Sequence, residues 1–225
     1  MKILIVDTIG NAVLCAAALI GLFYSLIRFF KPKQAMYKKM VACALGCIFI
    51  ERLYGIVQYA VAGDITPYFQ IGSFGNIGCF LFLFSANYGA VDSLIDDGSA
   101  EVKKYRLIAL AAPAAAVAAA IAILCSPSRP GKTITCAVEM LFAGASAYYS
   151  FKHLIIPKRY SDFLSDLRFF HFLSLVLAAG VAIEDILWCY NVTEQIMWIV
   201  PYLILLVPVV ALAPALERGT KKWEI

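Results

Sequence analysis

The chain has little charge for its size. Only 15% of its 225 residues are Asp, Glu, Lys or Arg, whereas 62% are hydrophobic and the mean hydropathy is +0.81. Soluble globular proteins have about 25% charged and about 45–50% apolar residues. A water-soluble fold of this length could not hide so much apolar surface. The composition therefore excludes an ordinary soluble enzyme, a disordered chain and a nucleic-acid-binding protein, and it indicates a multi-pass protein of the lipid bilayer.

Long polar segments are also missing, so we expect no soluble domain between the hydrophobic runs. A helix crosses the hydrocarbon layer with about 20 apolar residues. The sequence predicts an all-α integral membrane fold, a bundle of seven transmembrane helices forming a single domain over residues 1–225. The predicted spans are Ile9–Phe30, Met40–Ala62, Ile71–Ile95, Arg106–Cys125, Ile134–Ile156, Phe169–Tyr190 and Ile196–Leu216.

Positive charge is scarce on one side of these spans. Of the nineteen Lys and Arg residues, fifteen fall after the first, third, fifth and seventh spans, and only Lys2, Arg129 and Lys132 fall on the other side. The remaining one, Arg52, lies inside the second span. Because Lys and Arg concentrate in cytoplasmic loops, we expect the N-terminus outside, the C-terminus in the cytoplasm, and a location in the plasma (cytoplasmic) membrane.

A weak internal repeat links the two halves. At an offset of 125, Tyr24-Ser25 matches Tyr149-Ser150 and Pro32-Lys33 matches Pro157-Lys158. We expect two parallel triplets, residues 1–95 and 134–216, joined by a linker helix at 106–125. This layout resembles that of SWEET and PQ-loop transporters, and also that of opsins and seven-helix receptors. The Pro-Gln pair of the PQ-loop proteins is absent, and no Lys lies in the middle of a span to hold retinal.

Ionisable residues inside the spans are the candidate site. Each costs roughly 2.5–3.5 kcal/mol at the centre of a membrane helix, so such residues usually serve a function. Glu51, Arg52 and Glu139 lie at or above mid-membrane, while Asn87 and Asp92 lie nearer the cytoplasm. The ligand-binding residues predicted from the sequence are Glu51, Arg52, Tyr54, Gln58, Asn76, Glu139, Glu184, Asp185 and Trp188.

Four carboxyl groups and one guanidinium in this set favour a proton, a cation or a small polar solute as ligand. Arg52 has two alternative roles: it neutralises Glu51 or Glu184, or it clamps a carboxylate of the ligand with its planar fork. The plainer alternative is that Glu51 belongs to an inter-helix staple, and that Glu184 and Asp185 simply meet outer water. We expect no catalytic residues, no metal site and no cofactor, because no ligand spacing is recognisable.

Three further features have structural and functional interpretations. Cys125 and Cys136 flank one short outer loop, where a disulfide is conceivable in an oxidising compartment. Gly72, Gly75 and Gly78 favour close helix packing over a broken helix entrance. The prolines Pro201, Pro208 and Pro214 in the last span suit either a hinge or an ordinary membrane helix.

The leading hypothesis is a small polar-solute transporter or permease with an acidic intramembrane site. The alternative is a stand-alone seven-helix sensor or receptor, which binds an extracellular ligand and signals to a separate cytoplasmic partner. A third hypothesis is a structural subunit of a larger assembly, for which wide apolar grooves would be evidence. The expected partners are the lipid bilayer, a small polar or cationic solute or protons, and either a second copy of the chain or the cytoplasmic partner.

Overall fold

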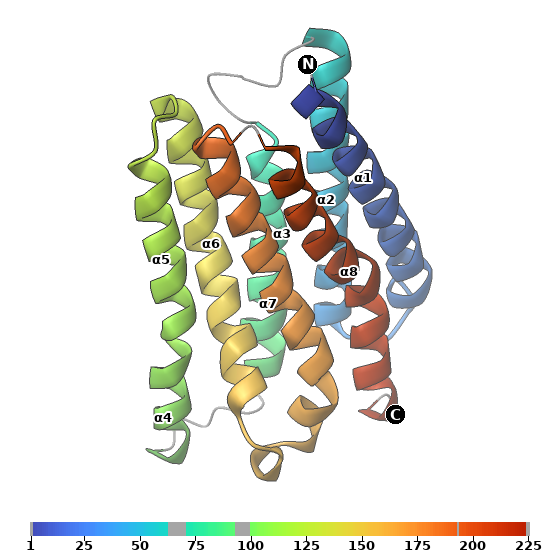
Figure 1. Cartoon of the computed structure of the whole chain (residues 1–225). Helices are drawn as coiled ribbons and strands as arrows, with labels where there is room; N and C mark the ends of the chain where they lie inside the picture. Colours follow the sequence, from blue (N-terminus) through green and yellow to red (C-terminus); the bar gives the residue numbers. More distant parts are fainter. Residues whose placement is uncertain (1, 63–70, 93–99, 193, 224–225) are drawn as a thin grey trace.

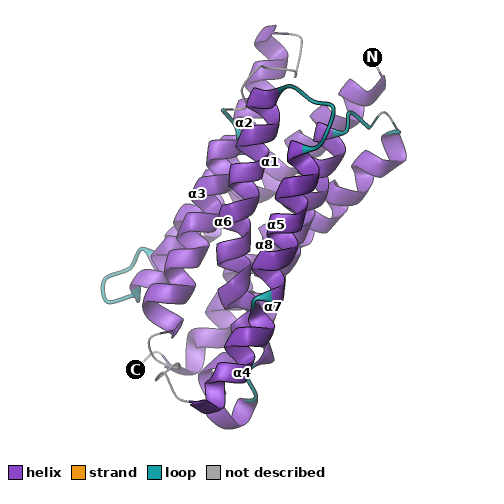
Figure 2. Cartoon of the chain, turned by 90° about the vertical axis from the view of Figure 1, so that its left-hand side faces the viewer, coloured by secondary structure: helices purple, strands orange, loops and turns teal. Residues whose placement is uncertain are grey.

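The computed structural model describes residues 2–62, 71–92, 100–192 and 194–223, and within these ranges all regular structure is helical (Figures 1 and 2). The predicted all-α class is confirmed for this part of the chain. The elements are α1 (Lys2–Phe29), α2 (Met36–Ala62), α3 (Ser73–Ala86), a π-helical turn η1 (Asn87–Val91), α4 (Ala100–Ala109), α5 (Ala111–Leu124), α6 (Pro130–Ile155), a short 3-10 turn (Lys158–Tyr160), α7 (Asp162–Cys189), α8 (Gln195–Thr220) and a closing 3-10 turn (Lys221–Trp223).

These helices form seven rods in the described part of the chain. α4 runs into α5 with only Leu110 between them, and α3 continues without a break into η1. Successive rods run up and down the bundle, which places the two chain ends at opposite ends of it (Figure 1). α5 lies at one edge against α6, and α1 lies at the other edge against α2 and α8 (Figure 1).

Five helical segments are long and apolar enough to cross a membrane, which is compatible with a multi-pass membrane protein. The other two rods, α3 and α6, do not meet the same test, since α3 has only 14 α-helical residues and α6 carries polar and charged side chains that it buries. The seven-span count, the sidedness and the repeat therefore stay predictions. The five segments are Val6–Phe29, Met36–Val61, Val102–Leu124, Asp162–Cys189 and Ile196–Trp223.

The third predicted span ends differently from our expectation. Its α-helix stops at Ala86 and gives way to the π-helical turn, which contains Gly89. Glycine is a poor α-helix former, and single π-helical turns often occur at functional sites. The last predicted residues of this span, 93–95, lie outside the described residues.

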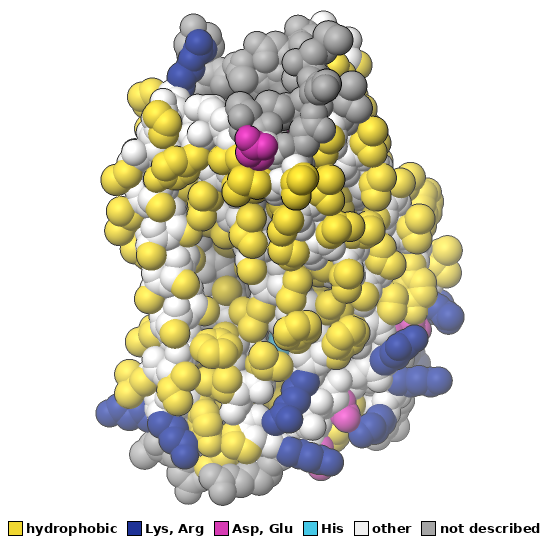
Figure 3. Space-filling view, viewed as in Figure 1, with side chains coloured by type: hydrophobic (Ala, Val, Ile, Leu, Met, Phe, Trp, Pro, Cys, Tyr) yellow, Lys and Arg dark blue, Asp and Glu magenta, His cyan; other side chains and the backbone are white. Residues whose placement is uncertain are grey.

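Apolar and basic side chains separate along the length of the bundle. Figure 3 shows hydrophobic side chains around the middle of the visible face and Lys and Arg gathered toward the lower end, where the C-terminus also lies. Large apolar residues such as Ile20, Ile27, Leu107 and Leu203 are exposed on the outer surfaces of different helices. An exposed apolar belt of this kind is what contact with lipid chains requires.

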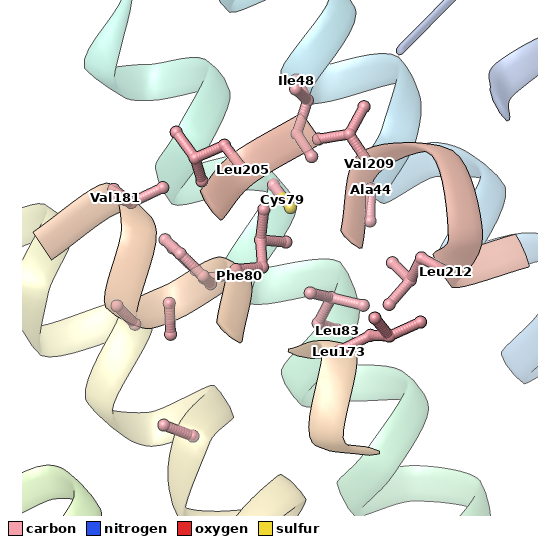
Figure 4. Close-up of a cluster of buried hydrophobic side chains, with 14 of the residues drawn as sticks. Ala44, Ile48, Cys79, Phe80, Leu83, Leu173, Val181, Leu205, Val209 and Leu212 are labelled. Atoms are coloured by element: carbon pink, nitrogen blue, oxygen red, sulfur yellow. The ribbon is translucent and has the colours of Figure 1, made fainter. Parts of the chain in front are cut away.

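A buried apolar core lies between α2, α3, α7 and α8. Figure 4 shows side chains from these four helices packed against one another in this cluster. All of those labelled are buried, and they are Ala44, Ile48, Cys79, Phe80, Leu83, Leu173, Val181, Leu205, Val209 and Leu212. This core holds in register the four helices that carry most of the candidate site.

Two other expectations concern helix continuity and grooves. α8 runs unbroken from Gln195 to Thr220 with Pro201, Pro208 and Pro214 inside it, and a hinge at these prolines stays a prediction.

An apolar groove of about 290 Å³ lies between α1 and α8, lined among others by Val6, Val13 and Leu203. This groove favours the assembly-subunit hypothesis.

The sequence left a disulfide between Cys125 and Cys136 open, and the structure shows that they are not bonded to each other. Cys125 is exposed at the end of α5, and Cys136 is buried inside α6. Cys136 faces α7 and lies in contact with Cys189 instead. The two cysteines lie close in the sequence, but Cys136 stands six residues into α6 after Pro130, where its side chain points away from the loop.

Glycine lets α3 approach α2 next to the candidate site, which confirms the packing interpretation at Gly75. A Cβ atom at Gly75 would lie 2.7 Å from the carbonyl oxygen of Cys47 and would overlap the side chain of Glu51. We expect Gly75→Ala to lower the free energy of unfolding by about 1–3 kcal/mol through overpacking.

Thermal unfolding in detergent micelles measures this change, and Gly46→Ala is the matched control. At Gly46 the nearest atom to an added Cβ is Leu22 Cδ1 at 3.6 Å, which is an ordinary contact. Equal stability of the two variants would contradict the close α2–α3 contact.

Candidate functional site

The site is organised around Arg52, which α2 points into the bundle. Its side chain is only 2% exposed, and its guanidinium binds Glu184 of α7 in a bidentate manner, with Nη1 to Oε1 at 2.5 Å and Nη2 to Oε2 at 2.7 Å. Arg52 Nε also lies 2.6 Å from Glu51 Oε2, although the N–H does not point at that oxygen, so the contact is an ion pair without a hydrogen bond. The sequence left open whether these neighbours would touch, and the structure shows that they do.

Helices α1 and α8 complete the network. Asn11 Oδ1 accepts a 3.0 Å hydrogen bond from Arg52 Nη1, and the Tyr202 hydroxyl donates a short hydrogen bond to Asp7. Gly10 allows this approach, because any side chain there would overlap the Tyr202 ring. Sequence analysis missed Asp7, Asn11 and Tyr202, although Asp7 and Asn11 stand four residues apart on one helix face, which was a usable signal.

A polar cavity of about 50 Å³ opens beside Arg52, with room for a few water molecules. Eight of the nine residues predicted from the sequence line it, and only Glu139 does not. Residues from five helices therefore converge here, as the hypothesis required, while their role in binding stays a prediction. The full lining is Asp7, Asn11, Glu51, Arg52, Tyr54, Gly55, Gln58, Gly72, Ser73, Asn76, Glu184, Asp185, Trp188 and Trp198.

Glu139 lies behind the cavity wall. It is fully buried on α6, and neither of its carboxyl oxygens receives a well-formed hydrogen bond from the described residues. The hydroxyl of Ser73 lies beside it and is equally unsatisfied. Ser73 belongs to the cavity lining, so Glu139 is separated from the cavity by a single side chain.

An apolar layer closes the cavity toward the basic end. Ile48 of α2 lies one helical turn from Arg52, Val181 of α7 one turn from Asp185, and Leu205 of α8 one turn from Tyr202. All three belong to the buried core shown in Figure 4. On these three helices, the side chains directly below the cavity are therefore apolar and buried.

Lys132 departs from its expected place in an outer loop. It lies in the first turn of α6, is buried, and donates a 2.6 Å hydrogen bond to the carbonyl oxygen of Trp188. Its ammonium also lies 3.7 Å from the centre of the Trp188 ring, which is a cation–π contact. An aromatic side chain of the cavity wall thus already holds one cation of the protein.

A second polar cluster occupies the basic end, where the sequence placed Asn87 and Asp92. Asp92 Oδ1 lies 2.5 Å from Lys152 Nζ and 3.0 Å from His153 Nε2, and Asn87 donates to Ser150 Oγ over 3.3 Å. His171 is fully buried, and its ring lies 4.8 Å from that of His153. The structure thus confirms that these residues are separate from the outer cluster.

The two clusters differ in their charge balance. Asp92 is matched by the adjacent Lys152, whereas the outer cluster has more carboxyl groups than cations. Its five carboxyl groups, Asp7, Glu51, Glu139, Glu184 and Asp185, are accompanied by only two buried cations, Arg52 and Lys132. Within the described residues no group of three or more His, Cys, Asp or Glu side chains is arranged to hold a metal ion. The excess of carboxyl groups suits protons or a small cationic or hydrogen-bonding solute.

Comparison with known proteins adds no further constraint. No protein-family model, no curated protein and no solved structure matches the chain.

Proposed function

We propose that this protein is a seven-span transporter or permease for a small polar or cationic solute, with its N-terminus outside. The observation that supports the proposal is the convergence of polar residues from five helices on one cavity that holds more carboxyl groups than cations. Buried charge of this kind inside an apolar bundle is costly, and a fold needs only one well-formed ion pair to fasten two helices. The surplus carboxyl groups are better explained by a positively charged or proton-donating ligand.

The cavity and the apolar layer below it fit one of the two states of an alternating-access transporter. The cavity lies at the end of the bundle opposite the basic end, and the buried layer at Ile48, Val181 and Leu205 separates it from that end. In a transporter, this is the arrangement of a site open to the outer side. The prolines inside α8 allow this helix to bend next to the site.

Uptake into proteoliposomes tests the proposal directly. The probes are methylammonium, guanidinium and the neutral solute glycerol, each radiolabelled, with the outer pH varied. We expect saturable uptake of at least one probe, a change of uptake on acidification, and a loss of about tenfold in Glu51→Gln, which corresponds to 1.4 kcal/mol of binding.

The matched control for this experiment is Asp162→Asn, which removes an exposed carboxyl group far from the cavity. We expect its uptake to equal that of the unmodified protein. Uptake no faster than in protein-free liposomes, or insensitive to both pH and Glu51→Gln, would contradict the proposal.

A stand-alone sensor is the second candidate. It is favoured by the buried apolar core beneath the cavity, because a receptor needs a binding site at one end and no passage. In this case the basic end would contact a cytoplasmic protein. Absence of flux for every probe, together with co-purification of a soluble partner, would favour the sensor.

A further inference from the structure

We infer that Glu139, with the Ser73 hydroxyl beside it, is a proton-binding site that serves the cavity from behind its wall. This inference deepens the proposed function and rests on it for the role of the proton, although the presence of the proton is tested independently. The carboxyl group of Glu139 is fully buried, and both of its oxygens lack a well-formed hydrogen bond from the described residues.

An ionised Glu139 does not fit these surroundings. A buried carboxylate needs a cation or several hydrogen-bond donors to offset its lost hydration. The two buried cations of the outer cluster, Arg52 and Lys132, have other partners. The terminal nitrogens of Arg52 bind Glu184 and Asn11, and the ammonium of Lys132 donates to the carbonyl oxygen of Trp188. The neutral acid, in contrast, needs one acceptor for its own hydroxyl, and the unsatisfied Ser73 Oγ stands beside it.

The groups that face Glu139 reinforce this conclusion. Those of neighbouring helices are Glu51 of α2, Cys79 of α3, and Glu184 and Asp185 of α7, and Cys136 lies on α6 itself. None of these side chains is a cation, and the three carboxyl groups would repel a negative charge. α5, which also packs on α6, contains no charged residue, and the charged residues of α4 lie at the opposite end of the bundle.

The position of Glu139 gives the proton a route to the solute site. Four of its neighbours line the cavity, whereas Glu139 itself does not; they are Ser73, Glu51, Glu184 and Asp185. A proton released by Glu139 has only to pass Ser73 to reach cavity water. A solute cation entering the cavity would favour that release, because it offsets the negative charge left on Glu139. Cation binding and proton binding then exclude each other, which is the basis of exchange.

Infrared spectroscopy of the full chain in liposomes tests the site without a known solute. We expect a carboxylic acid C=O stretching band at neutral pH in the unmodified protein, smaller by one carboxyl group in Glu139→Gln and shifted in frequency in Glu139→Asp. Asp162→Asn should leave the band unchanged. Replacing choline chloride by sodium chloride should also leave it unchanged.

Absence of the band from the unmodified protein would overturn the inference, and so would an equal band in Glu139→Gln. A loss of the band on addition of sodium ions would overturn it in favour of an alkali cation at Glu139. If Glu139→Gln does not fold, the test is the frequency of the C=O band, which should differ between Glu139→Asp and the unmodified protein. Failure of the proposed function is a separate result, because it appears as absent uptake with the band still present.

Discussion

Replacing Arg52 by Met is expected to lower the free energy of unfolding by about 3–5 kcal/mol, the usual effect of removing one partner of a buried ion pair. The guanidinium is almost completely buried, and it binds both oxygens of Glu184 as well as Asn11. Its loss leaves Glu184 beside Glu51 and Asp185 with no cation among them. The free energy of unfolding is measured by thermal unfolding or by detergent titration of the protein in micelles.

The double variant Arg52→Met with Glu184→Met should recover most of this loss, since a buried ion pair replaced by apolar groups is often neutral for stability. Arg28→Met is the control, because Arg28 is exposed and lies 3.7 Å from Glu217. A surface pair of this kind contributes about 0–1 kcal/mol. A double variant as unstable as Arg52→Met alone would contradict the pairing shown by the structure.

Asp92→Asn is expected to lower the free energy of unfolding by about 2–3 kcal/mol at neutral pH, somewhat less than for a fully buried pair because the Asp92 side chain is 14% exposed. The variant leaves the ammonium of Lys152, whose side chain is only 2% exposed, without its carboxylate, and it weakens the hydrogen bond to His153. Asp162→Asn, which breaks an exposed pair with Lys158, is the matched control and should change stability by less than about 1 kcal/mol.

The helical class and the depth of the site could be predicted, because both follow from where polar residues interrupt apolar runs. Glu51 and Arg52 stand near the middle of one long hydrophobic segment, and Glu184 stands in the outer third of another. Polar residues at similar depth on packed helices must lie near one another. The same reasoning left Asn87 and Asp92 out of the predicted ligand-binding residues, because they lie nearer the cytoplasmic end. The depth of a residue does not show how its helix is rotated or where its side chain points. The sequence therefore could not show whether Arg52 binds Glu184 or a carboxylate of the ligand.

The missed residues share a physical reason. Asp7 and Asn11 lie near the start of α1, where polar residues are expected to meet water, and Tyr202 lies in an apolar run that contains several prolines. The packing of α1 against α8 turns these side chains inward. The spacing of Asp7 and Asn11 shows that they share a helix face, but it does not show that α8 covers that face. The surroundings of Cys136 could not be predicted for the same reason, because the α6–α7 contact, rather than the nearest loop, places it beside Cys189.

Uptake by the double variant Arg52→Met with Glu184→Met is the most direct test of the central claim, that the charged network exists for a solute and not for the fold. If the claim holds, this variant unfolds at nearly the temperature of the unmodified protein and has lost uptake of the probe that the unmodified protein carries. Full uptake by the stable double variant would contradict it, and Arg52 and Glu184 would then form a structural ion pair that joins α2 to α7.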